Sequence, residues 1–425
     1  LAEKGYKPVV FEKNERPGGM LTYGIPNFKL QKDVIEAEVE VIRLMGAEFR
    51  YGVEVGRDVT LDELREQGFK AFYVAIGCQG GRLAGIPGED AEDVTVAVDF
   101  LREVNSGKID ALPGRTIVVG GGNVAIDVAR NACRLGSEHV EMFCLESEAQ
   151  MPASEEERRE AIEDGAHISC GWGPKEVHLD EAGRVCGITF KRCTCVFDDE
   201  GRFAPEYNEN DLRRVDADRV VMSIGQSIVW GDLLAGSKVE LGRGQGALAD
   251  PQTYQTAEPD IFVGGDVYTG PSFAIDAIAA GHEAAVSIHR FVQPGSTLTI
   301  GRNQRRYTAL DRDDVVIESY DNASREVAHV DREHEKTAPF SEYVETFTEE
   351  QVRAETARCL GCGASIVDPN KCIGCGLCTT KCAFDAIHLD RDRPECSTMV
   401  KYEQKLPSLG KYALKRAIKI KFGKK

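Results

Sequence analysis

Half of the 14 cysteines fall in a short stretch near the carboxyl end of the chain, and a subset of them is regularly spaced. The subset forms the pattern C-x2-C-x2-C-x3-C with Cys372, Cys375, Cys378 and Cys382. Thiolates at these intervals can hold a [4Fe–4S] cluster, because a tight loop turns successive sulfur atoms towards one centre. The pattern therefore predicts a redox centre that passes single electrons. Cysteines clustered at ligand spacings also indicate a reducing compartment, and we expect a cytoplasmic protein.

The three other cysteines of this stretch, Cys359, Cys362 and Cys396, leave alternatives open. A zinc ribbon could use the pairs at residues 359–362 and 372–375, but it would leave the last two thiols of the regular run without a role. A second iron–sulfur cluster could use these three cysteines as ligands. Two clusters with four thiolates each need one thiol more than the stretch contains. Either there is one cluster and the three further cysteines are spare, or a non-cysteine ligand or a partner's thiol completes a second cluster.

A glycine-rich pattern, G-x-G-x-x-A, occupies residues 120–125. When a strand precedes such a pattern and a helix follows it, the first glycine permits a tight turn and the second lets a pyrophosphate approach the backbone. The small third residue lets helix and strand pack closely, and the first amides of the helix face the phosphates. The pattern predicts a dinucleotide site with candidate contacts at Gly120, Gly122, Asn123, Val124 and Ala125.

The residue that contacts the adenosine ribose is expected about 20 positions beyond this turn, at the end of the next strand. That position is Glu146, which follows the apolar run 140–145. A carboxylate accepts hydrogen bonds from both ribose hydroxyls but repels a 2′-phosphate. Two unit charges about 4 Å apart interact by roughly 4 kcal/mol at an effective dielectric of about 20. Glu146 therefore predicts NAD(H) in preference to NADP(H).

A second nucleotide site, of the kind that binds FAD, is indicated by segments at the two ends of residues 1–290. An apolar run ends at an acid and is followed by Arg-Pro-Gly-Gly, and a later run ends at Gly-Gly-Asp before an Ala-rich helix expected over residues 272–285. We expect the first acid on the ribose, the glycines beside the pyrophosphate and the later Asp on the ribityl chain. The candidate contacts are Glu12, Arg16, Gly18, Gly19, Gly77, Gly225, Gly265, Asp266, Ser272 and Ala277. The strand and the phosphate-binding glycines that should precede the strand ending at Glu12 would lie before Leu1, so we expect a chain truncated at its N-terminus.

These motifs require parallel strands with helices between them. A strand over 116–119, the glycine turn, a helix over 124–134 and a strand over 140–145 form a βαβ unit, so we predict an α/β fold with parallel sheets. Further buried strands are expected at residues 7–12, 71–76 and 216–225, and a helix is expected over 31–45.

Charge and hydropathy exclude some classes of partner. The 425 residues include 52 Lys and Arg against 70 Asp and Glu, a net charge of −18, which argues against nucleic acid as a partner. No apolar run approaches the roughly 18 residues of a membrane span. The last 26 residues differ, with nine Lys or Arg and one Glu. Two interpretations remain open for this basic tail, a solvated terminal helix and a docking arm for an acidic partner.

Several motifs together resemble the glutamate synthase small-subunit family, whose members are flavoproteins with two dinucleotide-binding domains. The motifs are residues 12–26, 120–127, 151–153, 225–226, 265–266 with 277–285, and 355–360. The resemblance covers residues 1–290 and resumes at residue 355. NADPH-using members carry a pair of Arg residues where this chain has Leu145 and Glu146, in agreement with the charge argument.

The resemblance implies two Rossmann-like domains. FAD would be held by residues 1–112 and 216–292, with an NAD(P)H-binding domain, 113–215, inserted between them. A linker, 293–350, would then lead to a ferredoxin-like [4Fe–4S] segment, 351–398, and the basic tail, 399–425.

The combined prediction is an iron–sulfur flavoprotein subunit that transfers electrons between NADH, FAD and at least one [4Fe–4S] cluster. The other donor or acceptor would be another subunit of a redox complex or a ferredoxin. One alternative is a glutamate synthase small subunit serving an amidotransferase, although the cluster segment argues against it. The other is an electron-conduit subunit that has lost nucleotide turnover. No catalytic side chain is predicted, because the cofactors carry the chemistry.

Overall fold

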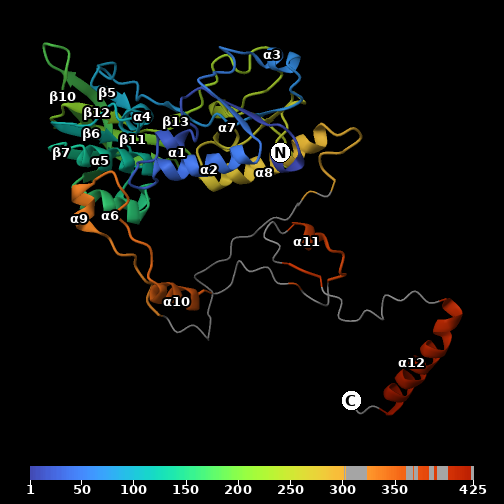
Figure 1. Cartoon of the computed structure of the whole chain (residues 1–425). Helices are drawn as coiled ribbons and strands as arrows, with labels where there is room; N and C mark the ends of the chain where they lie inside the picture. Colours follow the sequence, from blue (N-terminus) through green and yellow to red (C-terminus); the bar gives the residue numbers. More distant parts are fainter. Residues whose placement is uncertain are drawn as a thin grey trace. The chain divides into compact units, whose positions relative to one another are not determined.

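The computed structural model of the chain (Figure 1) describes residues 1–300, 302, 323–359, 367, 372–381, 387–389 and 401–422. The chain divides into two compact units, Leu1–Gln351 and Val352–Lys425. The first unit contains both predicted nucleotide sites, and the second contains the described part of the cysteine-rich segment.

A five-stranded parallel sheet forms the centre of the predicted NAD(P)H lobe. In spatial order its strands are β5 (Val94–Val96), β12 (Arg219–Met222), β6 (Arg115–Val119), β7 (His139–Cys144) and β8 (His167–Cys170). Helices α4 (Ala97–Asn105), α5 (Asn123–Arg134) and α6 (Glu155–Glu163) belong to the same lobe. The inner strands read as nearly continuous apolar runs because both faces of the sheet are covered.

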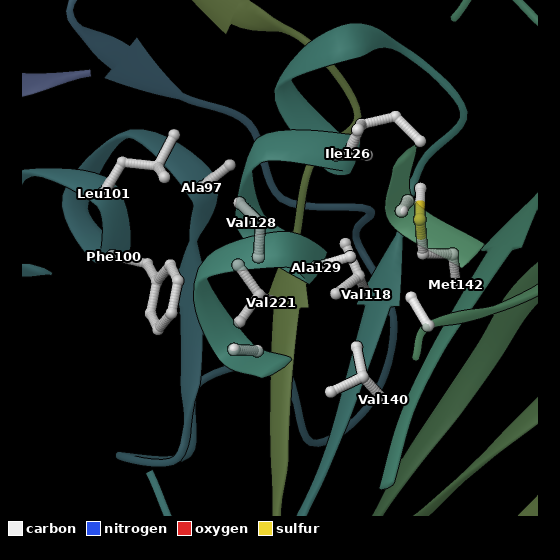
Figure 2. Close-up of a cluster of buried hydrophobic side chains, with 14 of the residues drawn as sticks. Ala97, Phe100, Leu101, Val118, Ile126, Val128, Ala129, Val140, Met142 and Val221 are labelled. Atoms are coloured by element: carbon white, nitrogen blue, oxygen red, sulfur yellow. The ribbon is translucent and has the colours of Figure 1, made fainter. Parts of the chain in front are cut away.

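The two faces of this sheet bury different side chains, as the alternation along a strand requires. Val118 faces helices α4 and α5, where Phe100 and Val128 are fully buried (Figure 2). Ile117 and Phe143 face the other way, and the Phe143 ring stacks on Phe190 with 3.9 Å between ring centroids.

The opposite face is covered by an antiparallel sheet that was not expected from the sequence. Its strands are β9 (Trp172–Leu179), β10 (Val185–Phe197) and β11 (Phe203–Val215). The register between β10 and β11 shifts at Lys191/Arg192 and again between Cys193 and Cys195. These bulges break the strict alternation of polar and apolar residues that would identify a strand in the sequence.

The predicted FAD lobe contains two separate pairs of parallel strands. Strand β1 (Val9–Glu12) pairs with β2 (Glu48–Tyr51), and β3 (Phe72–Val74) pairs with β14 (Ile261–Val263). A short antiparallel pair is formed by β4 (Gly80–Gly81) and β13 (Gln226–Ser227). It joins the two segments in which the chain passes between the lobes. The helices of this lobe are α1 (Met20–Tyr23), α2 (Lys32–Leu44), α3 (Leu61–Glu66), α7 (Asp266–Thr269) and α8 (Ala274–Phe291).

The sheet of the NAD(P)H lobe takes strands from outside the limits 113–215 predicted for that lobe. β5 and α4 lie before residue 113 and β12 lies after residue 215, yet β12 pairs with β6. The strand expected at residues 216–225 is therefore present but belongs to the other sheet. An apolar run of Val and Met identifies a buried strand, whereas its composition does not identify the neighbours with which it pairs. Helix α8 also differs, because it begins at Ala274 rather than at Ser272.

Residues 332–343 of the predicted linker pack on the NAD(P)H lobe. It contains α9 (Arg332–Thr337) and a buried Tyr343. Arg134 of α5 pairs with Glu335 at 2.6 Å and donates to the carbonyl of Pro339 at 2.7 Å. The buried Arg130 donates to the Tyr343 hydroxyl at 2.5 Å. The segment therefore lies against helix α5.

The helices at the carboxyl end are α10 (Glu349–Ala357), α11 (Leu377–Lys381) and α12 (Tyr402–Phe422). The basic tail thus contains a helix, and the side chains described in α12 are all exposed. Among the described residues, no helix is both long enough and apolar enough to cross a membrane.

Candidate functional site

The glycine turn between β6 and α5 has the geometry that a bound pyrophosphate requires. Gly120 has a φ of +144°, and a Cβ atom there would lie 2.2 Å from the carbonyl oxygen of Ser223. Gly122 precedes the first residue of α5, and a Cβ added there would meet nothing within 4 Å. Ala125 is fully buried, so its small side chain lets the helix pack closely. The backbone at Gly122 is therefore open to a ligand at a helix N-terminus.

Glu146 lies beside this turn. Glu146 is the second residue after β7, and its carbonyl oxygen accepts a hydrogen bond from the Gly171 amide at 2.9 Å. Its Oε2 atom lies 3.0 Å from the position that a Cβ atom of Gly121 would take. The structure thus places the half-buried Glu146 carboxylate next to the glycine turn, where a dinucleotide presents its adenosine ribose.

A segment not identified as a positioning element in the sequence closes the turn from the other side. The Ala153 amide donates to the Gly121 carbonyl at 3.0 Å, and the Ser154 amide donates to Asn123 Oδ1 at 3.2 Å. The Asn123 side-chain oxygen therefore holds the start of α6, so a phosphate would be met by the N–H groups of Asn123 rather than by this oxygen. The Met-Pro-Ala motif of the family resemblance was the available signal for this role.

The candidate FAD contacts gather around residues 77–82, which follow β3. The side chain of Gln79 lies 3.7 Å from the position of a Cβ atom on Gly19, and the Cys78 thiol donates to the Asp266 carbonyl at 3.8 Å. The Arg82 side chain lies 3.6 Å from the corresponding position on Gly225. Segments far apart in the sequence thus meet at the carboxyl ends of β1, β3 and β14. Gln79 and Cys78 were not among the predicted contacts.

Two predicted residues at the end of β1 already have protein partners. Glu12 accepts hydrogen bonds from the backbone amide and the side-chain amide of Asn14 at 2.9 Å and 2.7 Å. Arg16 forms an ion pair with Glu36 at 2.6 Å. Gly18 must be glycine, because it has a φ of +103° and a Cβ atom would lie 2.4 Å from Thr22 Oγ1.

Asp266 and its predicted neighbours form one cluster at the start of α8. Asp266 accepts a hydrogen bond from the Ser272 amide at 3.3 Å, and burial raises the pKa of its carboxyl group. Gly265 lies against Ala277, with 3.3 Å between its Cβ position and the Ala277 Cβ. Next to this cluster, the Phe273 side chain is 76% exposed. A Cβ atom on Gly77 would meet nothing within 4 Å. Open backbone at Gly77, the half-buried carboxyl of Asp266 and an uncovered apolar side chain fit a flavin nucleotide.

The described part of the cysteine run has a backbone suited to sulfur ligands. The Gly374 amide donates to the Cys372 sulfur at 3.4 Å, and Gly374 and Gly376 have φ values of +66° and +78°. The four cysteines described in this segment, Cys359, Cys372, Cys375 and Cys378, are exposed.

The other candidate ligands, Cys362, Cys382 and Cys396, lie outside the described residues. Within the described ranges, no three His, Cys, Asp or Glu side chains gather into a metal-binding group. The ligand set therefore stays a prediction.

Comparison with known proteins identifies the family. The family described as "Pyridine nucleotide-disulphide oxidoreductase" matches residues 1–281, which include both glycine-rich regions. The chain belongs to this family of FAD-dependent oxidoreductases. A second family, described as "4Fe-4S binding domain", matches residues 365–388 and thus covers the regular cysteine run.

Among relatives of this oxidoreductase, the NADP(+)-dependent formate dehydrogenase subunit beta of Moorella thermoacetica is 33% identical over 378 residues, 85% of this chain and 52% of the relative. The glutamate synthase [NADPH] small chain of Escherichia coli is 33% identical and is matched over 69% of this chain and 65% of the relative. The resemblance to the glutamate synthase small-subunit family is thereby confirmed, and the chain spans about half to two thirds of these relatives.

A comparison of folds agrees with the family assignment. FprA from Mycobacterium tuberculosis superimposes with a TM-score of 0.57 at 20% identity, over 67% of this chain and 77% of FprA. The α/β fold with two dinucleotide-binding lobes and a carboxyl-terminal iron–sulfur segment is confirmed.

Proposed function

We propose that this oxidoreductase is a subunit of a redox complex and exchanges electrons between NADH, FAD and a [4Fe–4S] cluster. The observation that carries the NADH assignment is the Glu146 carboxylate beside the open glycine turn. The family and the iron–sulfur domain support the other two cofactors.

Each part of the chain contributes binding and orientation. The Gly120–Gly122 turn and the first amides of α5 would hold the pyrophosphate of NADH, and Glu146 would accept hydrogen bonds from its ribose. The cluster around Asp266 and the open backbone at Gly77 would hold FAD. Bound FAD exchanges a hydride for two single electrons, which links nicotinamide chemistry to a one-electron cluster.

The names of the relatives include both nicotinamide coenzymes. The formate dehydrogenase subunit is named for NADP(+), the glutamate synthase small chain for NADPH and the dihydropyrimidine dehydrogenase subunit PreT of Escherichia coli for NAD. The charge at position 146 favours NADH for this chain, because a carboxylate in contact with the ribose repels a 2′-phosphate.

The same relatives are named as subunits, which supports a partner chain here too. The match to the formate dehydrogenase subunit covers 85% of this chain, whereas the match to the glutamate synthase small chain covers 69%. This difference favours a redox complex in which the carboxyl-terminal segment takes part. Delivery of electrons to an amidotransferase is less favoured. A ferredoxin is a further candidate partner, and we propose a cytoplasmic location.

Anaerobic stopped-flow reduction of the holoprotein tests the coenzyme assignment. Bleaching of the flavin near 450 nm should be fast at low NADH concentration and should require far more NADPH. Equal or better reduction by NADPH would contradict the assignment to NADH, and no bleaching with either coenzyme would favour the electron-conduit alternative.

A further inference from the structure

A cavity of about 440 Å³ lies beyond the glycine turn, on the side of Glu146. Its walls come from the loop that follows β7, from the end of β8 and from strand β10 of the antiparallel sheet. Leu145 and Ser147, the two neighbours of Glu146, both line it. The volume is enough for one nucleoside, and a dinucleotide with its ribose at Glu146 would direct its adenine away from the turn and into this space.

Arg192 of β10 contributes a flat cationic group to the cavity. Its guanidinium carbon lies 5.2 Å from the centroid of a Trp172 ring. A Cβ atom on Gly171 would lie 3.1 Å from this carbon and 3.3 Å from both terminal nitrogens, so the guanidinium lies face-on against Gly171. Gly171 has a φ of +79°. A glycine at this position therefore leaves room for the plane of the Arg192 side chain.

The guanidinium of Arg192 has no hydrogen bond or ion pair within the described part of the chain, in contrast to other cations of the same sheet. Lys191 pairs with Glu209 at 2.8 Å, and Arg213 pairs with Glu141 at 2.8 Å. Arg192 is exposed at the cavity, so its donors and its plane are accessible to a ligand.

We infer that Arg192, supported by Trp172 and Gly171, binds the adenine ring of NADH by stacking its guanidinium on the base. A guanidinium stacks well on aromatic faces because it is planar, delocalised and weakly hydrated. The Glu146 carboxylate on the adjoining loop disfavours a 2′-phosphate, which leaves the base as the group that reaches Arg192. The inference rests on the proposed function for the presence of NADH. It assigns the antiparallel sheet a direct part in coenzyme binding.

ADP-ribose is the probe that tests this inference, because it contains the adenine end of NADH and no nicotinamide. Trp172 is one of two tryptophans in the chain, so ADP-ribose should change the tryptophan emission of the holoprotein and W172F should remove that change. R192A should weaken ADP-ribose and NADH about tenfold each. R202A is the matched control, since Arg202 lies on the β10–β11 hairpin and is paired with Asp198; it should leave both affinities unchanged.

A lysine at position 192 separates stacking from simple charge. R192K keeps the charge and loses the plane, so stacking predicts that it remains several-fold weaker than the parent for ADP-ribose. Full rescue by R192K, or a loss of NADPH binding much larger than the loss of NADH binding in R192A, would show that Arg192 contacts a phosphate and would overturn the inference. Unchanged ADP-ribose affinity in R192A would also overturn it.

The outcome is separable from that of the proposed function. If NADH fails to bleach the flavin but R192A still weakens ADP-ribose, the adenine site stands and NADH oxidation does not. If NADH bleaches the flavin equally well in R192A and in the parent, the proposed function stands and the adenine site does not.

Discussion

Replacing Glu146 with Gln removes one charge and changes little else at the coenzyme site. The main-chain bond from the Gly171 amide to the Glu146 carbonyl stays, because it does not involve the side chain. Between unit charges about 4 Å apart, repulsion is roughly 4 kcal/mol at an effective dielectric of about 20, which is an upper figure. Since Glu146 is half-buried, screening by water and salt reduces this to about 1–2 kcal/mol.

We therefore expect E146Q to bind NADPH about 5- to 30-fold more tightly than the parent. NADH should bind several-fold more weakly, because hydrogen bonds to a charged acceptor are stronger than those to a neutral one. The assay is the concentration dependence of anaerobic flavin reduction with each coenzyme. The matched control is E138Q, an exposed Glu directly before the other end of β7, which should leave both values unchanged. An unchanged ratio of NADPH to NADH affinity in E146Q would refute the role of Glu146.

Four further predictions concern the scaffold and the cluster. G120A should lower the free energy of unfolding of the NAD(P)H lobe in urea by at least about 2 kcal/mol, because a Cβ atom would lie 2.2 Å from the Ser223 oxygen. It should also abolish NADH binding, and normal NADH binding by G120A would contradict this geometry. D164N should lower the free energy of unfolding by about 3–5 kcal/mol, since the Asp164 side chain is buried between Arg130 and Arg134. The surface change D33N should lower it by less than about 0.5 kcal/mol. Burial raises the pKa of Asp127 to about 6, so its contribution to stability is present at low pH and is lost as the pH rises through that value. The stability of D127N relative to the parent should therefore increase between pH 4 and pH 7, and a flat difference would show that the carboxyl titrates normally. C375A should lose the broad iron–sulfur absorbance near 400 nm and keep the flavin, whereas C195A, which changes an exposed thiol of β10, should keep both.

The turn between β6 and α5 could be predicted closely because its signals are local. An apolar run, three glycines and an Ala-rich helix occur within residues 115–134, and the structure begins α5 one residue before the predicted start. Glu146 could be placed because the distance between such a turn and the end of the next strand is fixed by the βαβ geometry.

Other features depend on contacts that no local pattern contains. Strand β12 pairs with β6 across about 100 residues of intervening chain, and its apolar run would suit either lobe. The buried Arg130 is stabilised by Asp164 and by Tyr343, 34 and 213 residues further along the chain. The flat arrangement of Arg192 on Gly171 requires two strands in register and a bulge, neither of which the sequence shows.

Freeze-quench electron paramagnetic resonance can follow electrons from NADH through the flavin to the iron–sulfur cluster. The holoprotein is mixed with NADH under strict exclusion of oxygen and frozen at increasing times. The prediction is that flavin bleaching precedes the signal of a reduced [4Fe–4S] cluster and that C375A bleaches without giving this signal. A reduced-cluster signal of parent intensity in C375A would contradict this electron path. So would a parent protein whose flavin bleaches while its intact cluster stays oxidised in a large excess of NADH.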